Sequence, residues 1–186
     1  MKINKRGIIE EKRKTKKITI KDYLFQGGTT AVILMLSDLL GQIILRNVRS
    51  YFVTPLFMGL YGFITGNLCF LMYTKLDSFE GPDLDRMKGF SWLKIKLAFY
   101  KMLFDQFVWS PFGTFMFIFV SSVVDSKNFS LSKVIGDYFR ILFDSYKIWP
   151  VIQMINFLFV PLDLRVMFIS VASLLWSTYV KIARQA

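Results

Sequence analysis

The sequence contains no histidine and a single cysteine, Cys69. Without histidine, the chain has no imidazole to act as a general base, activate a nucleophile or bind a metal or haem. One cysteine excludes a disulfide within the chain and a cysteine-cluster metal site. No pairing of a nucleophile with a base is recognisable among the remaining residues. The sequence therefore predicts a protein without enzymatic activity, catalytic residues, metal or cofactor, although bound lipid fits its composition.

Apolar residues are abundant instead. Of the 186 residues, 54% are hydrophobic and 17% are aromatic, and the mean hydropathy is +0.44. A compact domain of this length cannot bury so much apolar surface. The composition therefore predicts an integral membrane protein rather than a soluble one.

Four continuous apolar stretches follow the N-terminal region, at residues 24–45, 52–74, 97–124 and 162–180. Each is long enough to cross a hydrocarbon layer of about 30 Å as a helix that rises about 1.5 Å per residue. Their apolar residues are continuous rather than alternating, which argues against a membrane β-barrel. We predict an all-α integral membrane protein, a four-helix transmembrane bundle that forms one domain over residues 24–186.

Two shorter elements lie between the third and fourth spans. Residues 131–147 show apolar residues at helical spacing opposite charged ones, which predicts an amphipathic helix in the membrane interface. Residues 148–160 are too few to span and are bracketed by Pro150 and Pro161. We predict a half-helix that starts at Pro150 and is broken from the last span at Pro161.

Basic residues outnumber acidic ones by 24 to 13, which gives a net charge of +11. Residues 1–22 alone carry nine Lys and Arg and three acidic residues. We interpret residues 1–23 as a basic tail that binds anionic membrane lipids. Because the tail has no recognisable fold and no interleaved aromatic residues, nucleic acid is not predicted as a partner.

The orientation follows from the Lys and Arg residues that flank the spans. The N-terminus, the loop 75–96 and the C-terminus together hold 16 basic residues, and the opposite side holds six. With four crossings, both termini are predicted to lie on the same side, which is the matrix or a cytosol-like side.

Several polar residues interrupt the apolar stretches, although a charge in mid-membrane costs about 2.5–3.5 kcal/mol. They are expected to face the interior of the bundle, with Arg165 as the counter-ion of Asp38 or Asp105. Two interpretations stay open: a network that only fixes helix packing, or a hydrophilic path for solutes. The residues concerned are Asp38, Gln42, Lys101, Asp105, Gln106, Gln153, Asn156 and Arg165.

Glycines occur at regular intervals in the second span, at Gly59, Gly62 and Gly66. Small residues spaced four apart let two membrane helices approach closely. We therefore predict that these glycines are helix-packing residues.

Four motifs occur in a fixed order between residues 30 and 180. The last reads Trp149-Pro150-x-x-Gln153-x-x-Asn156-Phe157-x-x-Val160-Pro161-x-x-x-Arg165, followed by Trp176-x-x-Tyr179. The earlier ones are Ser37-Asp38-Leu39-Leu40-Gly41-Gln42, Tyr73-x-x-Leu76-Asp77, and Lys101-Met102-Leu103-Phe104-Asp105-Gln106 before Pro111. This order resembles the signature of the Mpv-seventeen and twenty-two-kilodalton peroxisomal membrane protein family.

The resemblance implies a four-span protein of the mitochondrial inner membrane, with the peroxisomal membrane as the alternative. It also implies a small-solute channel or pore-like protein in organelle homeostasis, without enzymatic activity. The alternative function is that of a structural accessory subunit of an inner-membrane assembly such as a respiratory-chain complex. The expected partners are other membrane subunits or further copies of the chain.

Overall fold

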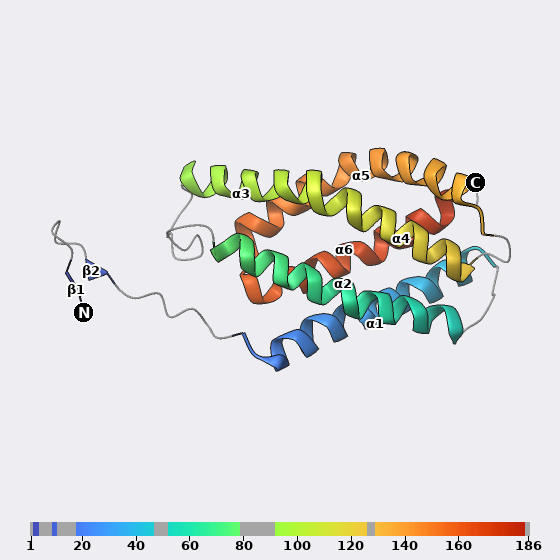
Figure 1. The fold of residues 1–186 in the computed structure, drawn as a ribbon, viewed down its shortest axis with the longest axis horizontal. Helices are drawn as coiled ribbons and strands as arrows, with labels where there is room; N and C mark the ends of the chain where they lie inside the picture. Colours follow the sequence, from blue (N-terminus) through green and yellow to red (C-terminus); the bar gives the residue numbers. More distant parts are fainter. Residues whose placement is uncertain are drawn as a thin grey trace.

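The computed structural model describes residues 2–3, 9–10, 18–46, 52–78, 92–125 and 129–184. Its main body is a bundle of long helices (Figure 1). They are α1 (Ile20–Ile44), α2 (Val53–Ser78), α3 (Trp92–Phe104), the π-helical turn η2 (Asp105–Trp109), α4 (Ser110–Asp125), α5 (Leu131–Phe159) and α6 (Leu162–Ala183). Near the N-terminus, the two-residue strands β1 (Lys2–Ile3) and β2 (Ile9–Glu10) pair antiparallel. Most of the predicted basic tail lies outside the described residues, and its last residues belong to α1.

The four predicted spans are confirmed as helices that are long and apolar enough to cross a membrane. They cover Ile20–Ile44, Val53–Ser78, Trp92–Val124 and Leu162–Ala183. The first span starts several residues earlier than predicted because Thr19 and Asp22 form a capping box, in which the Thr19 amide donates to Asp22 Oδ2 at 2.8 Å. The third span is continuous through α3, η2 and α4.

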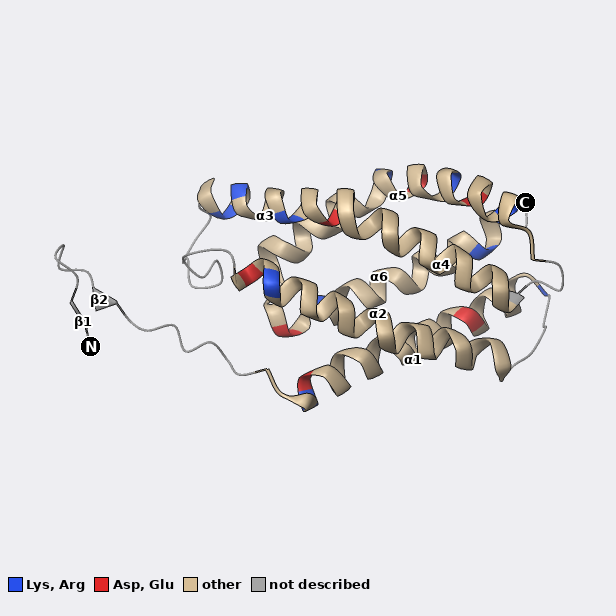
Figure 2. Cartoon of the chain, in the orientation of Figure 1, with Lys and Arg blue, Asp and Glu red and all other residues tan. Residues whose placement is uncertain are grey.

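The outer surface of the bundle is apolar. Large side chains such as Leu56, Phe107, Phe143 and Leu175 are more than half exposed. Figure 2 shows that the middle of α2 and of α4 carries no charged residue. This pattern, with exposed apolar side chains and buried polar ones, is what a lipid environment favours.

The predicted packing glycines lie on the face of α2 that contacts α1. A Cβ atom on Gly62 would lie 2.9 Å from the carbonyl oxygen of Thr30, and one on Gly66 would lie 2.5 Å from Thr30 Oγ1. A Cβ atom on Gly59 would lie 2.7 Å from Met35 Cγ. The two helices can therefore approach this closely only because these positions carry no side chain.

One continuous helix, α5, replaces the two shorter elements predicted over 131–147 and 148–160, so the predicted helix start at Pro150 is wrong. Pro150 lies inside α5, where its ring removes one backbone donor. Membrane helices tolerate such a proline because neighbouring helices stabilise the freed backbone group. The chain does break where Pro161 predicts it, since Val160 and Pro161 are extended between α5 and α6.

Helix α5 exposes apolar residues and buries polar ones. Its exposed side carries an apolar residue at nearly every fourth position: Leu131, Ile135, Phe139, Phe143, Val151, Ile155 and Phe159. Its buried side carries polar residues, among them Asp137, Ser145, Gln153 and Asn156. The polar side of α5 is thus turned into the bundle, and the apolar side is turned outward.

Helices α1 and α6 run parallel. Gln26 Nε2 donates to the carbonyl of Asp163 at 2.7 Å near the start of both helices, and Ser37 bonds to Ser177 further along. The start of α1 and the end of α6 therefore lie at opposite ends of the bundle (Figure 1). The prediction that both termini lie on one side assumed four alternating crossings. The parallel direction of α1 and α6 does not fit four crossings, because α5 also runs the length of the bundle.

Candidate functional site

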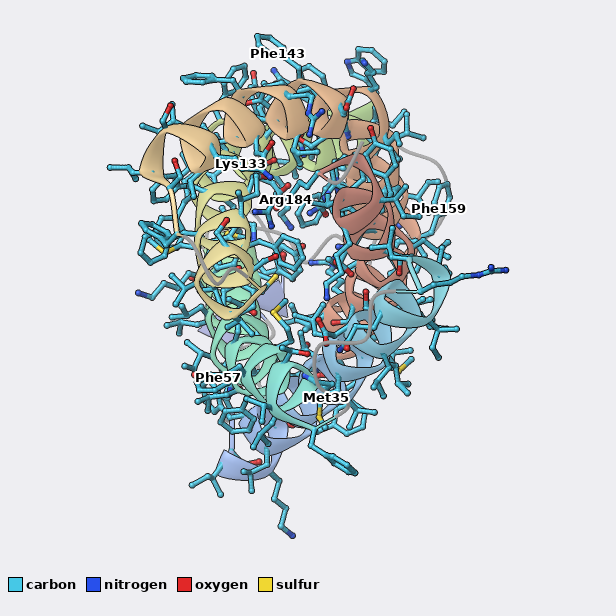
Figure 3. All side chains as sticks on the ribbon, turned by 90° about the vertical axis from the view of Figure 1, so that its right-hand side faces the viewer. Met35, Phe57, Lys133, Phe143, Phe159 and Arg184 are labelled. Carbon is cyan, nitrogen blue, oxygen red and sulfur yellow. The ribbon has the colours of Figure 1, made fainter. Side chains whose placement is uncertain are left out.

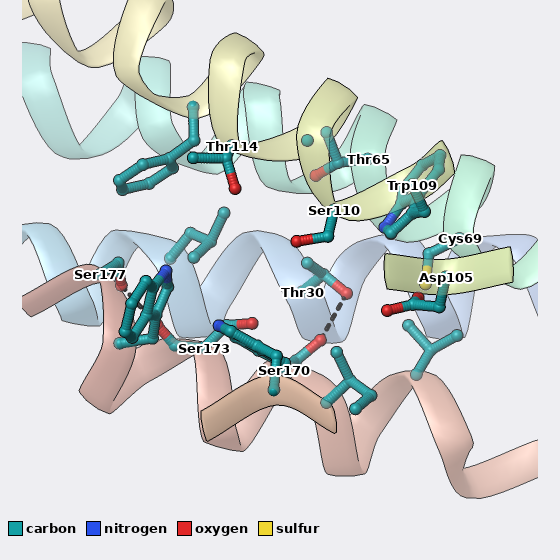
Figure 4. Close-up of a pocket in the computed structure, with 18 of the residues that line it drawn as sticks. Thr30, Thr65, Cys69, Asp105, Trp109, Ser110, Thr114, Ser170, Ser173 and Ser177 are labelled. Atoms are coloured by element: carbon teal, nitrogen blue, oxygen red, sulfur yellow. Dashed lines mark hydrogen bonds between the residues drawn. The ribbon is translucent and has the colours of Figure 1, made fainter. Parts of the chain in front are cut away.

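A pocket of about 160 Å³ lies inside the bundle (Figure 4). Its walls come from α1, α2, η2, α4, α5 and α6, so that α3 is the one bundle helix of the described residues that does not line it. Because these helices meet only in the folded protein, the pocket has no counterpart in any single segment of sequence.

Most of the polar groups in the pocket are neutral hydroxyls. They belong to Thr30, Tyr61, Thr65, Ser110, Thr114, Ser170, Ser173 and Ser177. Thr30 Oγ1 and Ser170 Oγ bond to each other at 2.9 Å across the interface of α1 and α6 (Figure 4). The rings of Trp109, Trp149 and Trp176 also line the pocket. Hydroxyl groups can donate and accept, so this wall suits small polar molecules.

Asp105 differs from these neutral groups because it is acidic. Among the described residues that line the pocket, there is no other acidic residue and no Lys or Arg. Asp105 lies on η2 and is 2% exposed. Gln106 Nε2 donates to its Oδ2 at 3.0 Å, whereas Oδ1 has no partner among the described residues. Figure 4 shows the carboxylate directed into the pocket.

A group of buried amides surrounds this carboxylate. Gln153 also lines the pocket, and its side chain interacts with Asp105 and bonds to the Tyr73 hydroxyl at 3.0 Å. Asn156 donates to Gln153 Oε1 at 3.2 Å. Gln106 Oε1 and Asn156 Oδ1 find no partner in the described part of the chain. Each unpaired buried acceptor costs about 1–3 kcal/mol, so this group has unused capacity to bind a donor.

Beyond one end of the pocket lies an ion cluster around Asp77. Arg165 Nη1 lies 2.8 Å from both carboxylate oxygens of Asp77, and Lys101 binds the same carboxylate. The Arg165 guanidinium and the Lys101 ammonium both lie over the ring of Phe157. Arg165 and Lys101 are 1% and 3% exposed, whereas Asp77 is 23% exposed, so this partly buried cluster joins α2, α3 and α6.

A second ion cluster, centred on Asp38, lies near the other end of α6. Lys181 binds Asp38 Oδ1, and Thr54 donates to Oδ2 at 2.9 Å. Gln42 donates to the same oxygen at 2.7 Å. Gly41 provides the space for the lysine, since a Cβ atom there would lie 2.6 Å from Lys181 Cδ.

A third cluster at this end is built around Arg184, whose position between the helices is seen in Figure 3. Its Nε lies 3.0 Å from Asp137 Oδ2 on α5. Its two terminal nitrogens donate to Ser121 at 2.7 Å and to Ser122 at 2.5 Å on α4. Arg184 therefore ties α4 and α5 to the end of α6.

The pocket lies between these clusters. On α6 the residues that line it run from Val166 to Ser177. Arg165 directly precedes this stretch, and Lys181 follows it by one helical turn. The interior of the bundle is thus a neutral, hydroxyl-lined middle with ion pairs at both ends.

All eight polar residues that the sequence singled out are buried, but they do not form one group. Asp105 and Gln153 line the pocket, and the others belong to the amide group or to the ion clusters. Arg165 pairs with Asp77, so the expectation that it neutralises Asp38 or Asp105 is wrong. Sequence reasoning missed Asp77, Asp137, Lys181 and Arg184 as partners, because they lie near the ends of helices, where charges ordinarily reach water.

Metal binding finds no support in the described ranges, which hold no group of three or more Cys, Asp or Glu side chains placed to bind an ion. The one cysteine, Cys69, is buried and lines the pocket.

Comparison with known proteins relates this arrangement to a family. Residues 126–181 match the model of the Mpv17 / PMP22 family. This match and the relatives described below support a place in the Mpv17 / PMP22 family. A relative from Dictyostelium discoideum, named PXMP2/4 family protein 3, is 28% identical over 90% of this chain and 86% of its own length.

Other relatives of this chain carry a location in their names. A protein of Caenorhabditis briggsae named mitochondrial inner membrane protein Mpv17 is 34% identical over 47% of this chain and 50% of its own length. The Drosophila melanogaster protein of the same name is 25% identical over 86% of this chain and 94% of its own length. Together with the four apolar helices, these names support a multi-pass protein of the mitochondrial inner membrane. No solved structure matches the chain.

Proposed function

We propose that this protein provides a path for small polar solutes across the mitochondrial inner membrane, and that the pocket is the middle of this path. The observation that supports the proposal is the hydroxyl-lined pocket between helices whose outer faces are apolar. Protein interiors are closely packed and leave few voids, so a pocket of this size in the middle of the bundle is an exception.

In this proposal, the ion clusters close the path at its two ends. Arg184 crosses from α6 to α4 and α5 at one end, and Arg165 crosses to α2 at the other. Opening either end requires that these contacts separate, and a buried ion pair holds strongly when its partners are in place. Under this proposal, the path is closed with both clusters formed and opens when one of them separates.

Flux through proteoliposomes tests the proposal. We expect the purified full-length chain to admit erythritol and to exclude a larger sugar such as stachyose. Arg184→Gln should raise the erythritol flux, because it removes the charge that ties α4 and α5 together. Lys147→Gln is the matched control, since Lys147 is 71% exposed and pairs only with Asp144 among the described acidic residues. Protein that inserts and folds but passes no solute in either form would refute the path.

Cys69 supplies a second readout, because it is the one cysteine of the sequence and it lines the pocket. A water-soluble thiol reagent added to the reconstituted protein should label Cys69 faster in Arg184→Gln than in the wild type. A labelling rate that stays the same while flux rises would mean that the solute takes another route.

A structural accessory subunit is the second candidate. The observation in its favour is the row of exposed Phe side chains on α5, at Phe139, Phe143 and Phe159, which could contact protein as well as lipid. Native size after gentle solubilisation separates the two. Co-migration with respiratory-chain proteins in fixed ratio would support the subunit, whereas a monomer or small homo-oligomer would support the path. The basic tail would bind anionic lipid in either case.

The location is tested separately. Fractionation of source cells should place the protein with inner-membrane markers, and enrichment with peroxisomal markers would favour the alternative organelle.

A further inference from the structure

We propose that Asp105 and the amide group around it form a binding site for the ammonium group of a small amine. As a statement about the solute that is carried, this inference rests on the proposed function. The binding site itself can be tested without any flux.

Charge is the first argument. The two other buried carboxylates of the described residues, on Asp38 and Asp137, each bind a Lys or Arg side chain. Asp105 is 2% exposed, as Asp38 is, yet within the described ranges it has an amide as its neighbour and no cation. A carboxylate in such a place favours a cation as its partner.

Hydrogen bonding is the second argument, and it is independent of the first. Asp105 Oδ1, Gln106 Oε1 and Asn156 Oδ1 are all buried acceptors that lack a donor in the part of the chain that is described. Asp105 is the one of the three that lines the pocket, and Gln106 Nε2 already donates to its other carboxylate oxygen. An ammonium group brings up to three donors and a positive charge.

The shape and lining of the pocket decide between an inorganic cation and an amine. A volume of about 160 Å³ exceeds what one bare ion occupies. Trp109 and Trp149 are among the residues that line it, and aromatic rings attract organic ammonium groups. The hydroxyls of Ser110 and Ser170 can bind a polar group at the other end of the same molecule. Because no Lys or Arg of the described residues lines the pocket, a carboxylate or phosphate on the solute is disfavoured.

Asp105 is the first residue of the π-helical turn η2. In η2 one residue is inserted relative to an α-helix, which changes the side that each following residue presents. Asp105 and Gln106 are buried there, whereas Phe107 is 73% exposed. π-turns of this kind occur frequently at functional sites.

Binding to the full-length protein in nanodiscs is the test, with ethanolamine as the probe. Ethylene glycol replaces the ammonium by a hydroxyl, glycolate replaces it by a carboxylate, and potassium chloride supplies an inorganic cation. We expect ethanolamine to raise the thermal midpoint in a saturable manner and the other three to have no comparable effect. Asp105→Asn should weaken ethanolamine binding by about tenfold or more, because a charge-assisted hydrogen bond becomes a neutral one.

The control variant is Asp144→Asn, which removes a carboxylate of α5 that lies outside the pocket and pairs with Lys147. It should bind ethanolamine as the wild type does. Equal binding of ethanolamine and ethylene glycol, equal binding of potassium, or unchanged binding in Asp105→Asn would each overturn the inference.

Thiol labelling gives a second measurement that does not depend on affinity. An aminoethyl thiosulfonate carries an ammonium group and should modify Cys69 faster than the sulfonatoethyl reagent of opposite charge. Asp105→Asn should abolish this preference, and a preference that survives would count against the site. Amine binding without any erythritol flux would retain the site and refute the path, whereas flux without amine binding would do the reverse.

Discussion

At Gly62 the backbone of α2 comes within contact distance of the backbone of α1. A Cβ atom there would lie 2.9 Å from the Thr30 carbonyl oxygen and 3.0 Å from Ala31 Cα. Both are backbone atoms of a long helix, so neither can turn aside as a flexible side chain would.

Gly62→Ala should therefore destabilise the bundle by about 1–3 kcal/mol, the range of overpacked sites. Gly28→Ala is the matched control, because a Cβ atom there meets nothing within 4 Å. It should leave stability unchanged or raise it by up to about 1 kcal/mol, since alanine favours a helix more than glycine does. Thermal unfolding in detergent measures both, and equal midpoints for the two variants would contradict the close packing of α1 and α2.

Arg165 illustrates how far burial changes the value of an ion pair. It is 1% exposed and binds both oxygens of Asp77, whereas Lys147 is 71% exposed and binds one oxygen of Asp144. Loss of Arg165 would leave the partly exposed Asp77 with Lys101 as its remaining cation and would empty the buried space that the guanidinium fills.

We expect Arg165→Met to destabilise the protein by less than the cost of a completely broken buried pair, about 3–5 kcal/mol, because Lys101 still binds Asp77. Lys147→Met should have a much smaller effect. Arg165→Lys should fall between wild type and Arg165→Met, because lysine retains the charge but not the planar fork. Resistance to unfolding by increasing concentrations of SDS provides the comparison. Similar losses for Arg165→Met and Lys147→Met would show that the Asp77 cluster contributes little.

Among the elements, α5 is the one whose place in the membrane the sequence does not define. Its 29 residues extend about 43 Å at about 1.5 Å per residue, which is more than the hydrocarbon thickness. Its exposed face carries apolar residues from Leu131 to Phe159, together with the exposed Lys133, Arg140 and Lys147. These features favour a crossing helix over one that lies flat in the interface.

Spin labels along this face test the placement. With Cys69 replaced by alanine, single cysteines would be introduced as Ile135→Cys, Phe143→Cys, Val151→Cys and Phe159→Cys, each labelled in lipid bilayers. We expect the immersion depth to rise toward the middle positions and to fall again at the ends, because α5 runs along the bundle. One uniform shallow depth would instead show that α5 lies in the interface.

For the molecule as a whole, α6 holds the bundle together. It carries Arg165 and Lys181, and Arg184 directly follows its last turn; these three bind acidic residues of α2, α1 and α5 respectively. Because α6 runs parallel to α1, the chain must traverse the bundle an odd number of times between its first and last helices.

This geometry predicts that the N- and C-termini lie on opposite sides of the membrane. Tags at the two ends should therefore differ in their accessibility to protease in sealed, uniformly oriented vesicles. Detergent provides the control, because it opens the vesicles and should expose both tags equally. If both tags are digested, or both protected, before detergent is added, α5 does not cross and the orientation predicted from the Lys and Arg counts holds.

The sequence by itself determined the membrane class, the four apolar helices and the break at Pro161, because these depend on local composition and on the geometry of single residues. It also determined that the polar residues within the apolar runs are buried, since a charge such as Asp38 or Asp105 within an apolar run must avoid lipid.

Only the tertiary structure decided which of these residues meet. Arg165 binds Asp77, which is 88 positions away in sequence, and Lys181 binds Asp38, 143 positions away. Such pairings depend on helix direction and rotation. The same holds for α5, where contacts with neighbouring helices carry the chain through Pro150, and for the pocket, which exists only where six elements come together.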